Sequence, residues 1–506
     1  MVNKQKTKKY IIVLIDGAAD YKIKELQDKT PLQAAAKPNI NNLAENGVVG
    51  LIKTIPDGMA PGSDTANLSV LGFDPLKYST GRSSLEALSI GVDLSYSDIT
   101  YRCNLVTLSE EDNFEKRKMI DYSAGEITTE EARILIKYLS DNLDINAIIS
   151  SIKNNLKDLK KLNNLNNLYN FNNANNLNSY KIDSFFNDLE LKFYPGISYR
   201  HVIVLKDISL AKDFSSNNFS SNNLLNKKKL IQSKNNFVQV LFNEFINKKL
   251  KDLTPPHDIT GKIIGKYLPE LENIEQLEAE LLIGLMKESF TLLKEHPINK
   301  KRVSIGKNPA NSIWIWARAT KPNLDNFSKK FGINGVVISA VDLIRGIGVC
   351  AGLEPVFVHG ATGNINTNFE GKAKAAVDKL KEGKEFAYIH IEAPDECSHQ
   401  GNLRCKIKSI ELIDQHVIRT IINEMNKERL PFRVMILPDH PTPIQLKTHT
   451  SEPVPFLIYD SEKKFKLKNF DDIMSFKGFD EESAKESGIF INPGYKLIDL
   501  FLENNG

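Results

Sequence analysis

The sequence predicts an α/β protein built on a mainly parallel β-sheet layered by helices, with an α+β domain inserted into it. Three observations support this. Residues 10–15 form an uninterrupted apolar run, typical of a strand buried on both faces. After Lys321, strand patterns alternate with helical patterns, as in parallel sheets covered by helices. From about Asp93 the pattern differs, over roughly 200 residues, which is an ordinary domain size.

Length and composition narrow the classes of protein. A chain of 506 residues is too long for one core, so we expect two or three domains. Hydrophobic residues make up 41% and charged residues 25%, as in soluble globular proteins. A net charge of +3 argues against a dedicated nucleic-acid binder, and no apolar stretch has membrane-spanning length. We therefore expect a cytoplasmic protein without nucleic-acid or membrane partners.

The first predicted strand is followed by Asp16-Gly17 at its carboxyl end, where sites gather in open α/β sheets. An Asp at this place is also a common loop residue, so Asp16 is only a candidate. Residues 31–47 predict a helix that Pro38 must interrupt. Residues 48–52 predict the next strand.

A turn of small residues, 61–68, then opens a short helix with Ser63 in its first turn. Gly72 is expected to end this helix, with Pro75 just beyond. Unpaired N–H groups and the helix dipole make a helix N-terminus suitable for an oxyanion or a phosphate. A serine there is often simply a cap, so Ser63 alone leaves both interpretations open.

The middle of the chain predicts helices at 83–88, 129–139 and 274–295, and strands at 100–108, 199–205 and 312–317. Two Asn-rich tracts, near 152–182 and 212–236, bury too little apolar surface to offset their ordering entropy. We interpret both as mobile insertions. The predicted domains are residues 1–92 with 320–506, and the inserted residues 93–319.

Polar clusters follow the predicted strands of the C-terminal half. Asp395 and His399 follow strand 386–391, and Asp439 and His440 follow strand 434–437. In one parallel sheet the carboxyl ends of strands converge on one edge. Carboxylates and imidazoles suit Zn, Mn or Mg-like ions, and seven ligands would suffice for two ions. The candidates are Asp16, Ser63, Asp395, His399, Asp439, His440 and His449.

Two cations beside Ser63 are chemically reasonable. A free serine hydroxyl is a poor nucleophile near neutral pH. A divalent ion lowers the pKa of bound water from about 15.7 to near 7 and should act similarly on an alcohol. A second ion can stabilise charge on phosphoryl oxygens. This predicts phosphoryl transfer through a phosphoserine, although sulfuryl transfer or hydrolysis would use similar groups.

The four cysteines contain no C-x-x-C pair, so neither a zinc ribbon nor a disulfide framework is indicated. We expect all four to be reduced thiols, as is usual in the cytosol. His416 lies inside a predicted helix, where a packed or surface histidine is expected.

The motifs together resemble a known family over nearly the whole chain, apart from the Asn-rich tracts and the far termini. The family is the archaeal-type cofactor-independent phosphoglycerate mutases of the alkaline phosphatase superfamily. The matching stretches are 15–17, 61–64, 81–83, 101–107, 121–125, 394–399, 439–443 and 449–455. The combination is specific, whereas no single stretch is.

The resemblance implies an alkaline phosphatase-like domain with two metals, an inserted phosphotransferase domain, and interconversion of 3-phosphoglycerate and 2-phosphoglycerate without 2,3-bisphosphoglycerate. Ser63 would be the nucleophile. The ions would be Mn, Mg, Co or Zn. One would be held by Asp16, Ser63, Asp439 and His440, and the other by Asp395, His399 and His449. The implied substrate residues are Arg82, Arg200, His201, His257, Asp258 and Arg345.

Two departures from the family pattern stand out. Glu126 occupies a position where the family often has histidine, and Ala317-Arg318-Ala319 replaces an expected Gly-rich stretch. Two alternatives therefore stay open: a metal-dependent phosphohydrolase of the same superfamily, and a pseudoenzyme that binds phosphoglycerate without turnover. The sequence predicts no oligomeric state.

Overall fold

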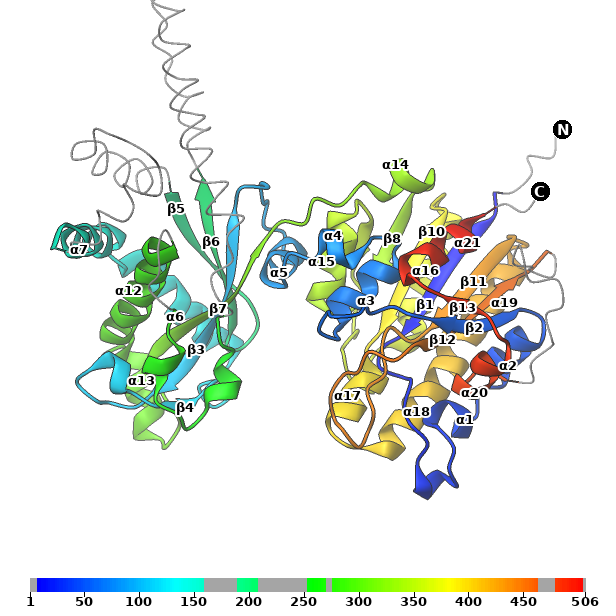
Figure 1. The fold of residues 1–506 in the computed structure, drawn as a ribbon, viewed down its shortest axis with the longest axis horizontal. Coiled ribbons are helices and arrows are strands. Elements are labelled where there is room, and N and C mark those ends of the chain that lie inside the picture. The colour runs from blue at the N-terminus through cyan, green and yellow to red at the C-terminus, as the bar shows by residue number, and fades with distance from the viewer. Residues whose placement is uncertain (1–6, 159–188, 208–252, 270–274, 463–477, 504–506) are drawn as a thin grey trace, which may run out of the picture. The chain divides into compact units, whose positions relative to one another are not determined.

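The structure is a computed structural model that describes residues 7–158, 189–207, 253–269, 275–462 and 478–503 (Figure 1). The chain divides into two compact units. The first unit comprises Met1–Ser79 and Pro322–Gly506, and the inserted unit is Thr80–Lys321. Helix α5 (Ser83–Ser89) falls in the inserted unit because it packs on that unit's strands. The division thus comes earlier in the chain than residue 92, where the sequence suggested it.

The first unit is organised around an eight-stranded sheet with the order β13-β2-β12-β11-β1-β10-β8-β9. Only β12 runs against the other strands, so the predicted mainly parallel α/β fold is confirmed. The strands are β1 (Lys9–Ile15), β2 (Val48–Ile52), β8 (Gly335–Ile338), β9 (Glu354–Val356), β10 (Phe386–Ile391), β11 (Phe432–Leu437), β12 (Val454–Asp460) and β13 (Phe490–Ile491).

Strand β1 lies in the middle of this sheet, and every one of its residues is buried. In Figure 1 the blue β1 lies between β10 and β11 from the C-terminal half. The register pairs Ile15 with Ile391 and Leu14 with Leu437. The carboxyl ends of these three parallel strands are therefore level, and the loops that leave them start side by side.

Helices cover both faces of the sheet. Helices α2, α16 and α18 pack through one apolar cluster, whereas α3 and α15 lie on the opposite face with Tyr388. The helices of the first unit are α1 (Pro31–Ala34), α2 (Pro38–Glu45), α3 (Ser63–Val70), α4 (Pro75–Tyr78), α14 (Phe327–Phe331), α15 (Asp342–Cys350), α16 (Phe369–Lys381), α17 (Ala393–His399), α18 (Leu403–Ile413), α19 (Arg419–Lys427), α20 (Glu481–Glu486) and α21 (Leu497–Leu502).

The helix predicted at residues 31–47 and the helix predicted around His416 are each divided. Pro38 starts α2 and separates it from α1, as expected for a residue without a backbone N–H. Between α18 and α19 a π-helical turn, Asp414–Ile418, contains the half-buried His416, which belongs to neither metal-ligand cluster. The buried Asp414 carboxylate accepts a hydrogen bond of 2.7 Å from the Ile40 N–H in the first turn of α2. It thus satisfies one of the N–H groups that a helix start leaves unpaired.

The inserted unit contains an antiparallel sheet in which β3 (Ile99–Leu108) pairs with β6 (Arg200–Asp207), β7 (Ser312–Thr320) and β4 (Met119–Asp121). Strand β5 (Leu189–Pro195) pairs with β6. The other α-helices in the described part of the inserted unit are α6 (Thr129–Asn142), α7 (Ile145–Asp158), α12 (Glu275–Lys294) and α13 (Pro297–Ser304). Helix α7 includes the beginning of the first Asn-rich tract. The rest of that tract and the whole second tract lie outside the described residues.

Arg318, one of the departures from the family pattern, is used inside the inserted unit. Its Nε lies 2.7 Å from Oε1 of Glu278 on α12, and both side chains are buried. Tyr101 also donates a hydrogen bond to Glu278. Burial, followed by the charge of Glu278, raises the pKa of Tyr101 well above its ordinary value. Arg318 therefore neutralises a buried carboxylate between β7 and α12.

The prediction of four reduced thiols is wrong. Cys397 of α17 and Cys405 of α18 form a disulfide, with their Cα atoms 5.5 Å apart. Cys103 and Cys350 are free. A sequence separation of 8 carries no recognised disulfide motif, and the two residues meet because α17 and α18 pack against each other.

We expect the denatured, unreduced protein to show two reactive thiols, those of Cys103 and Cys350. A colorimetric thiol titration in denaturant measures this, and reduction beforehand should raise the value to all four cysteines of the chain. Four thiols without prior reduction, in protein purified without reductant, would contradict the Cys397–Cys405 bond.

None of the described helices combines the length and apolar character needed to cross a membrane.

Candidate metal centre

Most of the candidate ligands lie in the segments that follow the carboxyl ends of β1, β10 and β11. Asp16 follows β1 directly, and Asp439 and His440 follow β11. Asp395 lies in α17, which begins just after β10. His449 lies in the loop between β11 and β12. The parallel register of the three central strands thus brings ligands from distant parts of the sequence to one edge.

The first cluster comprises Asp16, Asp439 and His440, whose ligand atoms all lie within 4.8 Å of one another. Nε2 of His440 lies 3.7 Å from Oδ1 of Asp16 and 3.4 Å from Oδ2 of Asp439. The hydroxyl of Ser63 lies 3.2 Å from the same His440 nitrogen. Since the N-cap of α3 is Gly62, Ser63 is the first helical residue and does not cap the helix. Its side chain instead faces the cluster.

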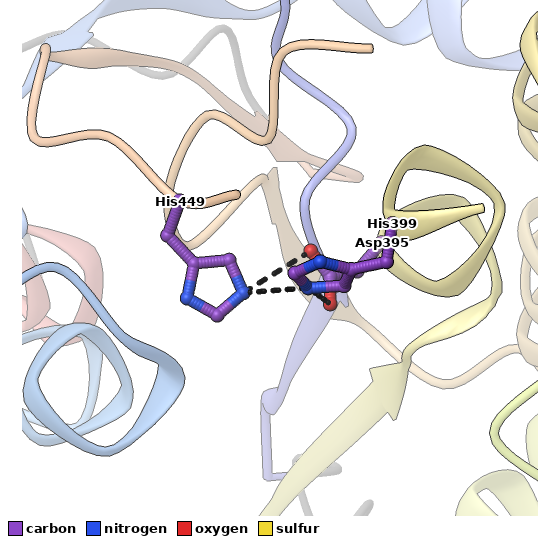
Figure 2. Close-up of side chains that lie close together, drawn as sticks. All are labelled: Asp395, His399 and His449. Carbon is purple, nitrogen blue, oxygen red and sulfur yellow. Dashed lines mark hydrogen bonds and ion pairs between the residues drawn. The ribbon is translucent and has the colours of Figure 1, made fainter. Parts of the chain in front are cut away.

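The second cluster comprises Asp395, His399 and His449 (Figure 2). Nε2 of His399 lies 3.1 Å from Oδ2 of Asp395, and Nε2 of His449 lies 3.5 Å from Oδ1. Figure 2 shows the two Nε2 atoms pointing toward each other, 3.0 Å apart. Two nitrogens and a carboxylate that converge in this way match the ligand types of a Zn- or Mn-like ion.

Thr442 links the two clusters. Its fully buried hydroxyl donates to Oδ1 of Asp395 at 2.6 Å and lies 3.2 Å from Nδ1 of His440. Because the Thr442 hydrogen is engaged by Asp395, Nδ1 of His440 must donate to Thr442. Nε2 of His440 is then left with a lone pair toward Asp16 and Ser63.

His399 is oriented in the same way. Its Nδ1 lies 2.9 Å from the Lys447 carbonyl oxygen, which can only accept a hydrogen bond. Nδ1 of His399 therefore carries hydrogen, and Nε2 points to Asp395. A second hydrogen bond that fixes the histidine tautomer is typical of metal-binding histidines.

Gly17 allows the two clusters to lie this close. A Cβ at this position would lie 2.4 Å from Oδ1 of Asp395 and 2.7 Å from Oγ1 of Thr442. Its φ of +62° also favours glycine. The Gly17 N–H donates to Oδ1 of Asp439 at 3.1 Å. Any side chain at residue 17 would displace a candidate ligand.

The charges of the first cluster suit a cation. Burial, then the negative charge of Asp439, raises the pKa of Asp16 well above its ordinary value. Oδ1 of Asp16 is buried and has no hydrogen-bond partner among the described residues. The histidines in contact with Asp16 are His390 and His440, and burial lowers the pKa of both, that of His390 to about 3. Neither brings a positive charge at neutral pH, so a divalent ion fits this cluster.

In the second cluster, His399 carries a proton that occupies the place of an ion. Burial alone would raise the pKa of Asp395, but hydrogen bonds from His399 and His449 hold it well below its ordinary value. The hydrogen bond to Asp395 raises the pKa of His399 to about 9. Metal ligation needs a neutral imidazole, so an ion that binds here must displace this proton.

None of the predicted substrate residues belongs to either cluster. Arg345 belongs to the first unit, where its guanidinium pairs with Asp342 and donates to the Ser339 carbonyl at 2.9 Å. The other five belong to the inserted unit: Arg82, Arg200, His201, His257 and Asp258.

Within the inserted unit, the side chain of His257 is about half exposed, and its ring packs edge-on against Tyr122 and Trp316. Arg200 stacks on Tyr199, with 5.1 Å between Cζ and the ring centre. Asp258 is exposed, 3.6 Å from His257, and Arg82 precedes α5 as its N-cap residue.

Glu126, the other departure from the family pattern, is exposed, and its N–H donates to Ser123. Nothing in these contacts assigns Glu126 a function.

His201 differs from the other candidates because it is buried in β6, with 2% of its surface exposed. Its Nδ1 accepts a hydrogen bond of 3.1 Å from the Gly196 N–H, and its Nε2 has no partner among the described residues. Burial lowers the pKa of His201 to about 3. A role of His201 in substrate binding stays a prediction.

His201 should make the inserted unit less stable in acid. Below the ordinary histidine pKa of about 6.5 the unfolded chain binds a proton that the folded state does not, so stability falls as pH drops toward about 3. For this one group the loss is about 2 kcal/mol at pH 5. Urea unfolding at pH 8 and pH 5, followed by fluorescence of Trp314 and Trp316 in β7, measures it. Equal pH dependence in wild type and His201→Gln would contradict this prediction.

Several residues that support the clusters were not predicted from the sequence. Thr442 lay within a quoted motif, between His440 and Pro443, but nothing there marked its hydroxyl as a bridge. Tyr388 and His390 lie on buried β10, where their spacing of two residues puts both side chains on one face. Their polar groups could have been noticed as unusual in a buried strand.

Comparisons with known proteins agree with this geometry. Residues 8–496 match the model of the Metalloenzyme superfamily, so the fold and the paired clusters belong to a metalloenzyme of that superfamily. The chain is 38% identical over 495 residues to the 2,3-bisphosphoglycerate-independent phosphoglycerate mutase of Methanosarcina barkeri, covering 98% of this chain and 99% of the relative. A probable enzyme of the same name from Geobacter sulfurreducens is also 38% identical, with 98% and 100% covered. The chain belongs to the 2,3-bisphosphoglycerate-independent phosphoglycerate mutase family, and the predicted resemblance is confirmed.

Solved structures show the same fold. The PH0037 protein from Pyrococcus horikoshii matches with a TM-score of 0.67 at 25% identity, covering 99% of this chain and 100% of that one. The cofactor-independent phosphoglycerate mutase from Thermoplasma acidophilum matches with a TM-score of 0.56 at 20% identity, covering 98% and 99%.

Proposed function

We propose that this protein interconverts 3-phosphoglycerate and 2-phosphoglycerate through a phosphoserine at Ser63, with two divalent ions and without 2,3-bisphosphoglycerate. The observation that carries the proposal is the position of the Ser63 hydroxyl, 3.2 Å from His440 in the first cluster, with the second cluster linked through Thr442. Family membership supports the substrate, since the relatives are named for it.

The ligand residues have separate roles in this proposal. Asp16, Asp439 and His440, with Ser63, would hold one ion, and Asp395, His399 and His449 would hold the other. Divalent ions bound there would supply Lewis-acid chemistry, which favours the ionised alcohol and offsets charge on phosphoryl oxygens. Oxygen and nitrogen ligands of this kind accept Mn, Mg, Co or Zn.

The reaction transfers one phosphoryl group twice. The Ser63 hydroxyl loses its proton, and its Oγ forms a bond to phosphorus as the bond from phosphorus to one glycerate oxygen breaks; that oxygen gains a proton. The other hydroxyl of the same glycerate then loses a proton and attacks phosphorus, and Oγ of Ser63 leaves and regains a proton. Because the phosphoryl group stays on Ser63 between the two steps, no bisphosphorylated cofactor is needed.

The glycerate carboxylate and the phosphate need cationic partners, for which Arg forks are well suited. Arg82, Arg200 and Arg345 stay predictions for this role. His201, His257 and Asp258 stay predictions for substrate binding, with Asp258 or His257 available for proton transfer. We also propose that the protein acts in the cytoplasm, where its substrate would be a small molecule.

One assay tests the proposal. The protein is incubated with 3-phosphoglycerate and Mn²⁺ or Co²⁺, without 2,3-bisphosphoglycerate, and coupled to enolase. Formation of phosphoenolpyruvate is the expected result. Release of inorganic phosphate instead would identify a phosphohydrolase, and the absence of both products would identify a non-catalytic binding protein. Either of these outcomes would overturn the mutase proposal.

A further inference from the structure

Asn67 lies one helical turn after Ser63 on α3 and joins the nucleophile's helix to a candidate metal ligand. It is completely buried, with 0% of its surface exposed. Its Nδ2 donates to the Ser63 carbonyl at 2.8 Å and to Oδ2 of Asp439 at 3.1 Å. Its Oδ1 accepts a hydrogen bond of 2.5 Å from the Tyr388 hydroxyl. All three polar contacts of this amide are therefore made inside the first unit.

The chemistry of the partners determines the orientation of the amide. The Ser63 carbonyl can only accept a hydrogen bond, so the NH₂ group of Asn67 must face it, and the same group faces Oδ2 of Asp439. The carbonyl oxygen then faces Tyr388, which can donate. Tyr388 is itself fully buried in β10. The strand, the helix and the loop after β11 are thereby joined by one side chain.

Asn67 contacts Oδ2 of Asp439, the carboxylate oxygen that faces His440 in the first cluster. Oδ2 of Asp439 is the atom 3.4 Å from Nε2 of His440, whereas Oδ1 accepts the N–H groups of Gly17 and His440. With both oxygens engaged, the Asp439 carboxylate cannot rotate without breaking a buried hydrogen bond, which is costly. The same Asn67 amide also holds the backbone of Ser63.

We propose that Asn67, oriented by Tyr388, is a positioning residue that sets the distance between Ser63 and Asp439 and aims the Asp439 carboxylate at the ion. The inference rests on the proposed metal-dependent phosphoserine function. Hydrogen-bonded partners of metal ligands typically contribute 10–100-fold in metal affinity or activity. Asn67 also contacts the backbone carbonyl of Ser63, the proposed nucleophile.

Ser69 provides a matched control on the same helix. It is also buried, and its hydroxyl donates to the Thr54 carbonyl at 2.5 Å. Among the described residues, its hydroxyl makes no hydrogen bond to Ser63 or to a member of either ligand cluster. Ser69→Ala therefore removes a buried hydrogen bond of α3 but keeps the hydrogen bonds of Asn67 to Ser63 and Asp439. A purely structural role of Asn67 would make the two substitutions equivalent.

The test compares Asn67→Ala, Asn67→Asp, Tyr388→Phe and Ser69→Ala in the full chain. Calorimetric titration of the metal-free proteins with Mn²⁺ measures metal affinity, and the enolase-coupled assay measures kcat and KM. We expect both Asn67 variants to bind one of two ions about 10–100-fold more weakly and to lose kcat, with KM changed less than about threefold. Tyr388→Phe should lower metal affinity and kcat by smaller factors, and Ser69→Ala should change neither metal affinity nor kcat.

Asn67→Asp keeps the shape and the acceptor for Tyr388 but lacks the NH₂ group, so it separates donation from packing. Wild-type metal affinity and kcat in a folded Asn67→Asp or Tyr388→Phe variant would overturn the inference. Losses in Ser69→Ala equal to those in Asn67→Ala would overturn it as well. If the wild type bound no Mn²⁺ and formed no phosphoenolpyruvate, the proposed function itself would fail, which these variants do not decide.

Discussion

Ser63→Ala is expected to reduce mutase turnover by at least about 10⁴-fold, because the variant has no oxygen to carry the phosphoryl group between the two glycerate positions. The backbone of α3 should be retained, since Gly62 is the N-cap and the Asn67 bond uses the Ser63 carbonyl, not its hydroxyl. The enolase-coupled assay measures the loss. Stoichiometry of bound Mn²⁺ measures whether the centre persists.

Ser69→Ala is the control for this variant as well, because it removes a buried serine hydroxyl from the same helix. It should retain turnover within about threefold. Mutase activity of Ser63→Ala within about tenfold of the wild type would exclude the phosphoserine route. The same activity with metal binding intact would direct attention to another nucleophile near the clusters.

Asp395→Asn is expected to remove one of two bound ions and to lower turnover by about 10³-fold or more. Asp395 contributes both of its oxygens to the second cluster, one near His399 and the other near His449. An amide lacks the charge that attracts the cation, and loss of a metal's several kcal/mol of transition-state stabilisation corresponds to a decrease of this size. Metal analysis of the dialysed protein, together with the coupled assay, measures both effects.

Glu396→Gln provides the neighbouring control. Glu396 lies on the same helix, and its carboxylate accepts a hydrogen bond of 2.9 Å from Gln400 and belongs to neither cluster. Glu396→Gln should retain both ions and nearly full turnover. If Asp395→Asn kept two ions per chain, the second cluster would not be a metal site, while the role of Ser63 would be unaffected.

Much of the fold could be predicted because local patterns determine it. The apolar run before Asp16 indicated a strand buried on both faces, and β1 has that burial throughout. Pro38 divides two helices because its ring cannot continue the first one. The antiparallel direction of β12 was not predictable in this way, since an apolar run looks the same whichever direction the strand takes.

The candidate site was predictable to the same extent. Asp16, Asp395 and Asp439 follow three strands, and the rule that parallel strands end at one edge was enough to group them. The rule about strand ends does not predict which residues bind the substrate. His201 illustrates the difficulty, because an alternating strand pattern does not reveal whether a histidine faces the core or a ligand, and this one is buried.

The sequence by itself determined most of the strands, the helix that begins at Ser63 and the choice of candidate ligands, because each follows from a local pattern of residues. Only the tertiary structure decided that Thr442 bridges the clusters, that Asn67 lies between Tyr388 and Asp439, and that Cys397 meets Cys405. A hydrogen bond or a disulfide needs its two partners within a few ångströms. For residues as far apart in the chain as Asn67 and Tyr388, strand register and helix packing set that distance, and no local pattern records it.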